Sequence, residues 1–289
     1  RKTTFLELCE DALVEIASCC DGIAAIVGLP ILTADGTISA AALIQDRKVL
    51  RYIGKKYITA RREMGFLVPS KGYEYATIKG HKCAIIVGDD LSRERDFDQS
   101  VETVISINAR KYGKGTMTYR YEMMRNLAFV ESKNLVLVNQ VGGSTDIVYD
   151  GTSGALNSRG ELVLMMKNFE EDFQIFDTKA SARPISIPST YNDRTRLVYE
   201  AARCGLRDFF RKNGYRKASI GLSGGIDSAV VASIAADALG AENVRALLMP
   251  SPFSSLESVE DAKELARNLG IEYNVIPISE IYTLSLIHI

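Results

Sequence analysis

A stretch rich in glycine and serine, IGLSGGIDSAVVA at residues 220–232, is the part of the sequence best suited to chemistry. Apolar runs flank it on both sides, which predicts a strand before it and a helix after it. Glycines at such a turn let backbone N–H groups approach an anion, and the helix N-terminus adds partial positive charge. A plain tight turn explains one glycine but not the whole set. We therefore predict a phosphate-binding loop made of Gly221, Leu222, Ser223, Gly224, Gly225, Ile226, Asp227 and Ser228.

The residues after Gly225 distinguish this loop from a Walker A loop. A Walker A loop ends in Gly-Lys-Ser/Thr, and its lysine supports the transferring γ-phosphate. Here Ile226 and Asp227 follow the glycine. A carboxylate beside phosphates is unfavourable without a cation, so we predict that Asp227 binds Mg²⁺; the alternative is a first-turn acid that interacts only with the helix dipole. A loop without the lysine favours pyrophosphate as the leaving group of ATP, with attack at the α-phosphorus and an adenylylated product.

Helical and strand patterns alternate strictly around the loop. This alternation predicts a doubly wound parallel sheet, and the loop stands where such a sheet places its ligand crevice. Ser254, with Glu257 three residues later, predicts a capping box for one of the helices. The predicted order is helix 197–213, strand 218–222, helix 226–239, strand 244–249, a helix from 254 to 270 and strand 272–278.

The front of the chain predicts a different, layered α/β domain. A helix over 4–20 is followed by buried apolar strands, by a hairpin that turns near Asp46, and by short strands separated by Gly, Asn and Ser turns. The segment RPISIPSTYNDRT has two prolines and the polar composition of a linker. We therefore predict a first domain over 1–182, a linker over 183–195 and a second domain over 196–289.

Composition excludes several classes of protein. The 289 residues suffice for about two domains, and 46% hydrophobic with 25% charged residues is a globular composition. The net charge of −1 predicts neither a nucleic-acid nor a membrane partner, and no apolar run reaches the length of a membrane span. Five cysteines without C-x-x-C spacing predict reduced thiols in a cytoplasmic protein. The start within a helical pattern at Arg1, and the end at YTLSLIHI, lead us to expect truncation at both ends.

The second half resembles a known family. GLSGGIDSAVVA resembles the pyrophosphate loop of the N-type ATP pyrophosphatases, and VRALLMPSPFSSLESVEDAKELARNLGIEYNVIPI is similar to the stretch that follows it in NAD synthetases. The resemblance implies ATP-dependent amidation of deamido-NAD to NAD through an adenylylated carboxylate, with release of AMP and pyrophosphate. It also makes Leu248 and Met249 candidate neighbours of the adenine, although ordinary core at a strand end explains them equally well.

The first half carries a second resemblance. VNQVGGSTDIVYDGTSGALNSRGEL is very similar to the late strands of the nitrilase-like amidase domain of glutamine-dependent NAD synthetases. The resemblance implies an α-β-β-α sandwich and a homo-oligomer. It also implies a Cys nucleophile, a Glu base and a Lys that stabilises the oxyanion. The family's Cys lies in a C-E-D segment, where this sequence has Gly88 within IIVGDDLS. The family's Lys aligns with Lys55 of GKKYI, which without the Cys is more simply read as a vestige on a solvated face.

Two further positions depart from the family pattern. Arg61 replaces a tyrosine, and NARK, with Arg110 and Lys111, replaces the N-A-S-P stretch that contacts glutamine. With Gly88, these departures predict a degenerate amidase, so the nitrogen would come from ammonia that is free or delivered by another protein. Two alternatives stay open: another ATP-pyrophosphatase amidotransferase, such as a GMP or asparagine synthetase, and a non-catalytic scaffold.

Overall fold

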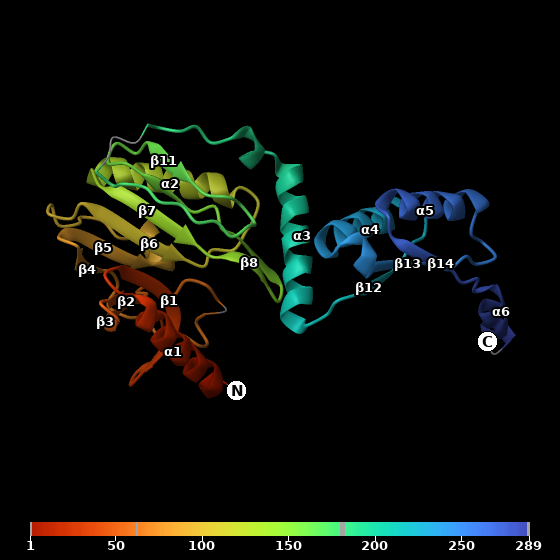
Figure 1. Ribbon diagram of the computed structural model, residues 1–289, viewed down its shortest axis with the longest axis horizontal. Coiled ribbons are helices and arrows are strands. Elements are labelled where there is room, and N and C mark those ends of the chain that lie inside the picture. The colour runs from red at the N-terminus through yellow and green to blue at the C-terminus, as the bar shows by residue number, and fades with distance from the viewer. Residues whose placement is uncertain (1, 62, 180–182, 288–289) are drawn as a thin grey trace. The chain divides into compact units, whose positions relative to one another are not determined.

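The computed structural model describes residues 2–61, 63–179 and 183–287 (Figure 1). The chain forms two compact units. Unit 1 comprises Arg1–Val141 and Tyr149–Pro188, and unit 2 comprises Gly142–Val148 and Ser189–Ile289. The finer division into domains 1–182 and 196–289 stays a prediction. Within the described ranges, none of the helices combines the length and the apolar composition that crossing a bilayer requires.

Unit 1 contains two sheets. The smaller sheet is an antiparallel meander with the order β1-β2-β3. The larger sheet has the order β11-β10-β7-β6-β5-β4, with β5, β6 and β7 parallel and the outer pairs antiparallel. The strands are β1 (Ala24–Thr33), β2 (Gly36–Gln45), β3 (Lys48–Gly54), β4 (Glu74–Ile78), β5 (His81–Val87), β6 (Thr103–Asn108), β7 (Asn134–Asn139), β10 (Gly154–Leu156) and β11 (Leu162–Met165).

A helix covers each sheet, and a shared core joins the sheets. Leu13 of α1 (Lys2–Cys19) packs against Ile44 of β2. Leu43 of β2 points to the opposite face and packs with Ile85 of β5, so the two sheets lie face to face. The buried side of α2 (Thr116–Glu131) lies along the larger sheet (Figure 1). The layers therefore run α-β-β-α, as predicted, because both faces of each sheet are apolar and each needs a partner.

One strand of unit 1 was not predicted from the sequence. The segment Glu74–Ile78 forms β4 and pairs with β5 through a tight turn at Lys79 and Gly80, both in the left-handed region. Tyr73 and Tyr75 gave this segment no clear alternation of apolar and polar residues. Pairing with β5 places Ala76 in the core, which explains why so polar a segment becomes a strand.

Unit 2 is built on a three-stranded parallel sheet with the order β12-β13-β14. Alternating helices and strands form it, so the predicted parallel sheet is confirmed. Its elements are η2 (Ser189–Tyr191), α3 (Arg194–Asn213), β12 (Ala218–Gly221), α4 (Ile226–Leu239), η3 (Ala241–Asn243), β13 (Val244–Leu248), α5 (Leu256–Leu269), β14 (Glu272–Val275) and α6 (Ser279–Ile287).

The capping box predicted at Ser254 is wrong by one residue. The N-cap of α5 is Ser255, whose hydroxyl accepts a hydrogen bond from the backbone N–H of Ser258 at 3.1 Å. The hydroxyl of Ser254 instead accepts from the N–H of Ser251, at 2.9 Å, in the loop before the helix. Adjacent serines offer equivalent caps in the sequence, and only the path of this loop decides between them.

A hairpin of β8 (Val141–Ser144) and β9 (Ile147–Asp150) contributes its tip to unit 2. There the Gly143 N–H donates to the buried carboxylate of Asp208 on α3, at 2.7 Å. The Lys212 ammonium donates to the Gly143 carbonyl one turn further along the helix. These bonds give α3 a polar anchor in addition to its apolar face.

Candidate functional sites

The phosphate loop, residues 221–228, connects β12 to α4 as predicted. Gly225 is the N-cap residue of α4, and no side chain caps this helix. The N–H groups of its first turn therefore stay available to an anion. Ser228 folds back under the loop: its hydroxyl donates to the Gly225 carbonyl at 2.9 Å and lies 3.0 Å from the Ser223 hydroxyl. The loop is thus braced by its own serines, which also accept hydrogen bonds from the N–H groups of Ser223 and Gly225.

Gly224 lies where the loop meets the first turns of α5. Its φ of +82° is in the left-handed region, which glycine adopts without strain. A Cβ at this position would overlap the backbone carbonyl of Ser258. The residue is therefore a glycine for two independent reasons, its backbone conformation and the close approach of α5.

Asp227 is exposed in the first turn of α4. Its carboxylate makes no hydrogen bond or ion pair with another described residue. Within the described ranges, no three His, Cys, Asp or Glu side chains converge as a complete metal site. A single carboxylate beside a phosphate loop nevertheless fits Mg²⁺, which takes its other ligands from water and substrate phosphates.

The two candidate adenine neighbours differ in their surroundings. Leu248 is only 2% exposed and belongs to the core between the sheet and its helices. Met249, the next residue, is 48% exposed, and its Cε lies 3.4 Å from where a Cβ on Gly221 would be. Met249 thus lies over the beginning of the phosphate loop, whereas the side chain of Leu248 faces inward.

Gly88 and Lys55 form the second candidate site, in unit 1. Gly88 follows β5, opens the 3-10 helix η1 (Gly88–Ser92) and has a φ of +62°. A Cβ on Gly88 would lie 3.6 Å from Nζ of Lys55. The structure therefore brings together the two residues that the sequence aligned with a nucleophile and an oxyanion lysine. Lys55 is 4% exposed, so its placement on a solvated face is wrong.

Carboxylates neutralise the buried lysine. The Lys55 ammonium donates to Glu63 Oε2 at 2.8 Å and lies 3.7 Å from Asp89 Oδ2. Arg110 binds the other oxygen of Asp89 at 2.6 Å. Burial by itself would raise the pKa of Asp89, but Arg110 and Lys55 outweigh it and hold that pKa below its ordinary value. A closed set of two cations and two anions results.

Asp90 fixes the backbone next to this lysine. It is completely buried, and its two oxygens accept hydrogen bonds from the N–H groups of Lys56, at 2.6 Å, and Tyr57, at 2.9 Å. Burial raises the pKa of Asp90, although both of these bonds oppose the rise. Asp90 therefore ties the turn after β5 to the segment that carries Lys55.

The other two departures differ in their contacts with the Lys55 site. Arg110 reaches the site through Asp89, as described above. Arg61 is exposed, and Lys111 is exposed and pairs through its backbone with Tyr149. Asn139 holds the Arg110 backbone from β7: its side chain accepts from the Arg110 N–H at 2.8 Å and donates to the Arg110 carbonyl at 3.3 Å.

Known proteins resemble the chain along nearly its whole length. A family model described as NAD synthase matches residues 198–288. The glutamine-dependent NAD(+) synthetase of Aquifex aeolicus is 34% identical over 322 aligned positions, which cover 96% of this chain and 56% of the relative. The structure of the glutamine-dependent NAD+ synthetase from Acinetobacter baumannii, in complex with ADP, matches with a TM-score of 0.83 and 29% identity over 97% of this chain and 55% of that one.

The chain is a homologue of the glutamine-dependent NAD(+) synthetases. It spans the nitrilase-like part and the start of the NAD synthase domain, about half the length of these relatives. A carbon-nitrogen hydrolase of Helicobacter pylori G27 matches 58% of this chain and 66% of its own, with a TM-score of 0.50 and 17% identity. This last likeness concerns the fold alone and agrees with the two-sheet architecture of unit 1.

In this NAD synthetase homologue, the sequence patterns did not predict the carboxylates that pair with Lys55. Glu63 reaches the lysine from a turn and Asp89 from η1, and neither belongs to a spacing pattern that would predict an ion pair. The sequence feature that could have pointed to them is the high density of charged residues in RREMG and GDDLS around an apolar strand. Charged residues that a fold buries next to a lysine pair with it, because an unpaired buried charge is strongly unfavourable.

Proposed function

We propose that the protein acts in ATP-dependent amidation of deamido-NAD to NAD, with ammonia supplied from outside its own amidase site. The loop between β12 and α4 is the observation that supports ATP-dependent amidation. The terminus of α4 has no side-chain cap there, and no lysine follows Gly225. Homology to enzymes named NAD synthetases, one of which binds ADP, supports the acceptor and the nucleotide. It favours deamido-NAD over the acceptors of other ATP-pyrophosphatase amidotransferases.

The chemistry consists of two transfers. A carboxylate oxygen of deamido-NAD attacks the α-phosphorus of ATP, and the bond to pyrophosphate breaks. The lone pair of ammonia then attacks the acyl carbon; AMP leaves with the electrons of the C–O bond, and the nitrogen loses a proton. The N–H groups at the start of α4 bind the departing pyrophosphate, while the Ser223 and Ser228 hydroxyls hold the loop in shape. Gly221 and Met249 form the nearby surface that would contact the base.

Asp227 is the residue of this chain that would hold Mg²⁺. It is exposed and without a partner among the described residues, next to the amide groups that would bind phosphates. When bound, the ion would supply charge neutralisation for the pyrophosphate. The Asp227 carboxylate would hold it beside the N–H groups at the start of α4.

The amidase part of the proposal depends on Gly88. Glutamine hydrolysis in nitrilase-like domains needs a thiol, and the backbone position facing Lys55 carries a hydrogen instead of a side chain. Cys83 is buried within β5, and burial raises the pKa of its thiol, so it does not replace the missing nucleophile. Lys55 therefore remains as a neutralised, structural cation.

Comparing nitrogen donors tests the proposal. In a protein extended to the full length of its relatives, with Gly88 unchanged, NAD formation is measured with deamido-NAD, ATP and either ammonia or glutamine. We expect ammonia to support turnover and glutamine to give less than about 1% of that rate, because no nucleophile faces Lys55. Glutamine-driven turnover at a rate close to that with ammonia would contradict the degenerate amidase. Failure with both donors would contradict the ligase itself.

Gly88→Cys is expected to create a reactive thiol beside Lys55. The nearby ammonium favours the thiolate, so at pH 7 iodoacetamide should alkylate Cys at position 88 about 10-fold faster than the exposed Cys19. Peptide mass spectrometry after timed labelling measures both sites in one sample. The matched control adds Lys55→Met and Glu63→Gln to Gly88→Cys, so that Glu63 is not left as an uncompensated charge, and it should remove the advantage. Equal alkylation with and without the lysine would show that Lys55 does not influence this position.

A further inference from the structure

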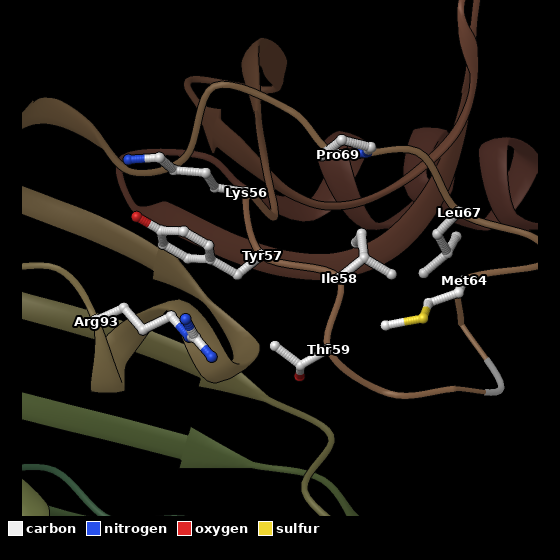
Figure 2. Close-up of a pocket in the computed structure, with 8 residues that line it drawn as sticks. All are labelled: Lys56, Tyr57, Ile58, Thr59, Met64, Leu67, Pro69 and Arg93. Carbon is white, nitrogen blue, oxygen red and sulfur yellow. The ribbon is translucent and has the colours of Figure 1, made fainter.

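A groove of about 490 Å³ on unit 1 lies next to the Lys55 segment but has separate walls. Figure 2 shows side chains of two kinds around it: Lys56, Tyr57 and Arg93 toward one end, and Ile58, Met64 and Leu67 toward the other. Its volume falls in the range of small-molecule sites, about 300–1,000 Å³. A cavity that is cationic at one end and apolar at the other selects for an amphipathic ligand.

Arg93 carries the unmatched charge of the groove. Its guanidinium lies 5.1 Å from the centre of the Tyr57 ring and has no carboxylate partner among the residues described. Lys56 lies 5.0 Å from the same ring, but its ammonium is already paired with Glu94 Oε1 at 3.3 Å. The contact with the face of the Tyr57 ring leaves the N–H donors of the guanidinium free at the groove, which Arg93 lines.

The other end of the groove offers apolar contact surface. Ile58 and Leu67 are half-buried and provide fixed walls, whereas Met64 is 61% exposed. Figure 2 shows the Met64 thioether at the same end as Ile58 and Leu67, and all three line the groove. An exposed, unbranched thioether can fold over an apolar ligand and gain contacts that water does not give it.

We propose that this groove binds a small carboxylate with an apolar body, the carboxylate on Arg93 and the body against Ile58, Met64 and Leu67. One unmatched positive charge calls for a monoanion, and the guanidinium fork matches the two oxygens of a carboxylate. The apolar end excludes a bare inorganic anion as the preferred ligand. The site is distinct from the Lys55 site, because Lys55 faces Gly88 while Lys56 and Tyr57 line the groove.

Asp90 connects the two sites structurally. It holds the N–H groups of Lys56 and Tyr57, which line the groove, and it follows Gly88 by two residues. The wall of the groove is therefore anchored in the core and does not depend on a ligand for its shape. A preformed wall avoids part of the ordering penalty on binding.

Binding of hexanoate to the 289-residue chain tests the proposal. NMR spectra of methyl-labelled protein follow the Ile58 and Met64 methyl groups during titration. We expect saturable shifts with hexanoate. Acetate lacks the apolar body and hexanamide lacks the charge, so each should bind at least about 10-fold more weakly than hexanoate. Inorganic phosphate is the third comparison. Phosphate binding as tight as that of hexanoate, or no shift of these methyl groups with hexanoate, would overturn the proposal.

Arg93→Gln is the decisive variant, with Arg95→Gln as its matched control. Both arginines are exposed and two positions apart, but Arg95 does not line the groove. Arg93→Gln should weaken hexanoate binding about 10-fold, since it removes a charge-assisted pair, while Arg95→Gln leaves the affinity unchanged. Thermal unfolding checks that both variants are folded. Equal affinities for Arg93→Gln and the unchanged chain would overturn the assignment of the carboxylate to Arg93.

Discussion

Gly224→Ala is expected to lower the free energy of unfolding of unit 2 by about 3 kcal/mol. Two separate effects add up. The left-handed backbone at φ +82° is strained for any residue with a Cβ, and that Cβ would also meet the Ser258 carbonyl. The obstacle is backbone of α5, which cannot rotate away as a side chain would. The phosphate loop must shift, so ATP binding to the chain should weaken about 100-fold. Urea denaturation and calorimetric titration with Mg·ATP measure the two losses.

Gly225→Ala is the matched control for stability. Gly225 has φ −86° and ψ 156°, which any residue adopts, and a Cβ there would lie 3.4 Å from the Ser223 hydroxyl, an ordinary contact. Its free energy of unfolding should therefore change by less than about 1 kcal/mol. If both variants lose the same stability, the close approach of α5 is not what requires glycine at position 224.

The place of the loop between a strand and a helix was predictable because its signals are local. The change from an apolar strand to glycines and then to a helical pattern lies within thirteen residues, and the structure has β12 end at Gly221 and α4 begin at Ile226. The reason for Gly224 was not predictable in the same way. Ser258 lies 34 positions later, and only the packing of α5 on the loop brings its carbonyl there. Local sequence patterns predict where the chain turns, but not which distant residues pack against the turn.

The site in unit 1, in contrast, depends on contacts between residues that are distant in the sequence. The pairing of Lys55 with position 88 came from resemblance to a family, since no periodicity links residues 33 positions apart. The structure brings the two positions together, but it also surrounds the lysine with Glu63 and Asp89. The simpler interpretation of Lys55 as a solvated residue failed because exposure depends on how two sheets and their loops close, which local sequence does not encode.

Retention of this charge arrangement has a physical explanation that needs no catalysis. Removing one partner from a buried ion pair leaves an uncompensated charge, which is strongly destabilising. Because Lys55, Glu63, Asp89 and Arg110 form a closed set, a glycine at position 88 is compatible with the fold, whereas removing the lysine alone would leave Glu63 without its partner. A glycine at φ +62° even relieves the strain that a side chain would impose there. The charged set can therefore stabilise the fold whether or not position 88 carries a nucleophile.

Asp227→Ala is expected to abolish adenylylation by a synthetase of the relatives' full length. On the proposed role, Asp227→Ala would remove the side-chain ligand for Mg²⁺ at the loop, and the charge on the departing pyrophosphate would be less well neutralised. Formation of AMP from ATP and deamido-NAD should fall at least about 100-fold, since a metal's contribution amounts to several kcal/mol. Asp227→Asn should behave similarly, because an amide binds Mg²⁺ far more weakly than a carboxylate does.

The control for Asp227 lies on the same helix. Asp237 is about 15 Å further along the axis of α4, where it contacts the Tyr199 hydroxyl at 3.2 Å and Arg203 at 3.7 Å. Asp237→Ala should leave the rate of AMP formation within a factor of about two, since surface pairs contribute little. If Asp227 served only the helix dipole, its removal would lower stability by about 0.5 kcal/mol and leave AMP formation intact. Survival of AMP formation in Asp227→Ala would therefore assign the residue to the helix and exclude it from the metal.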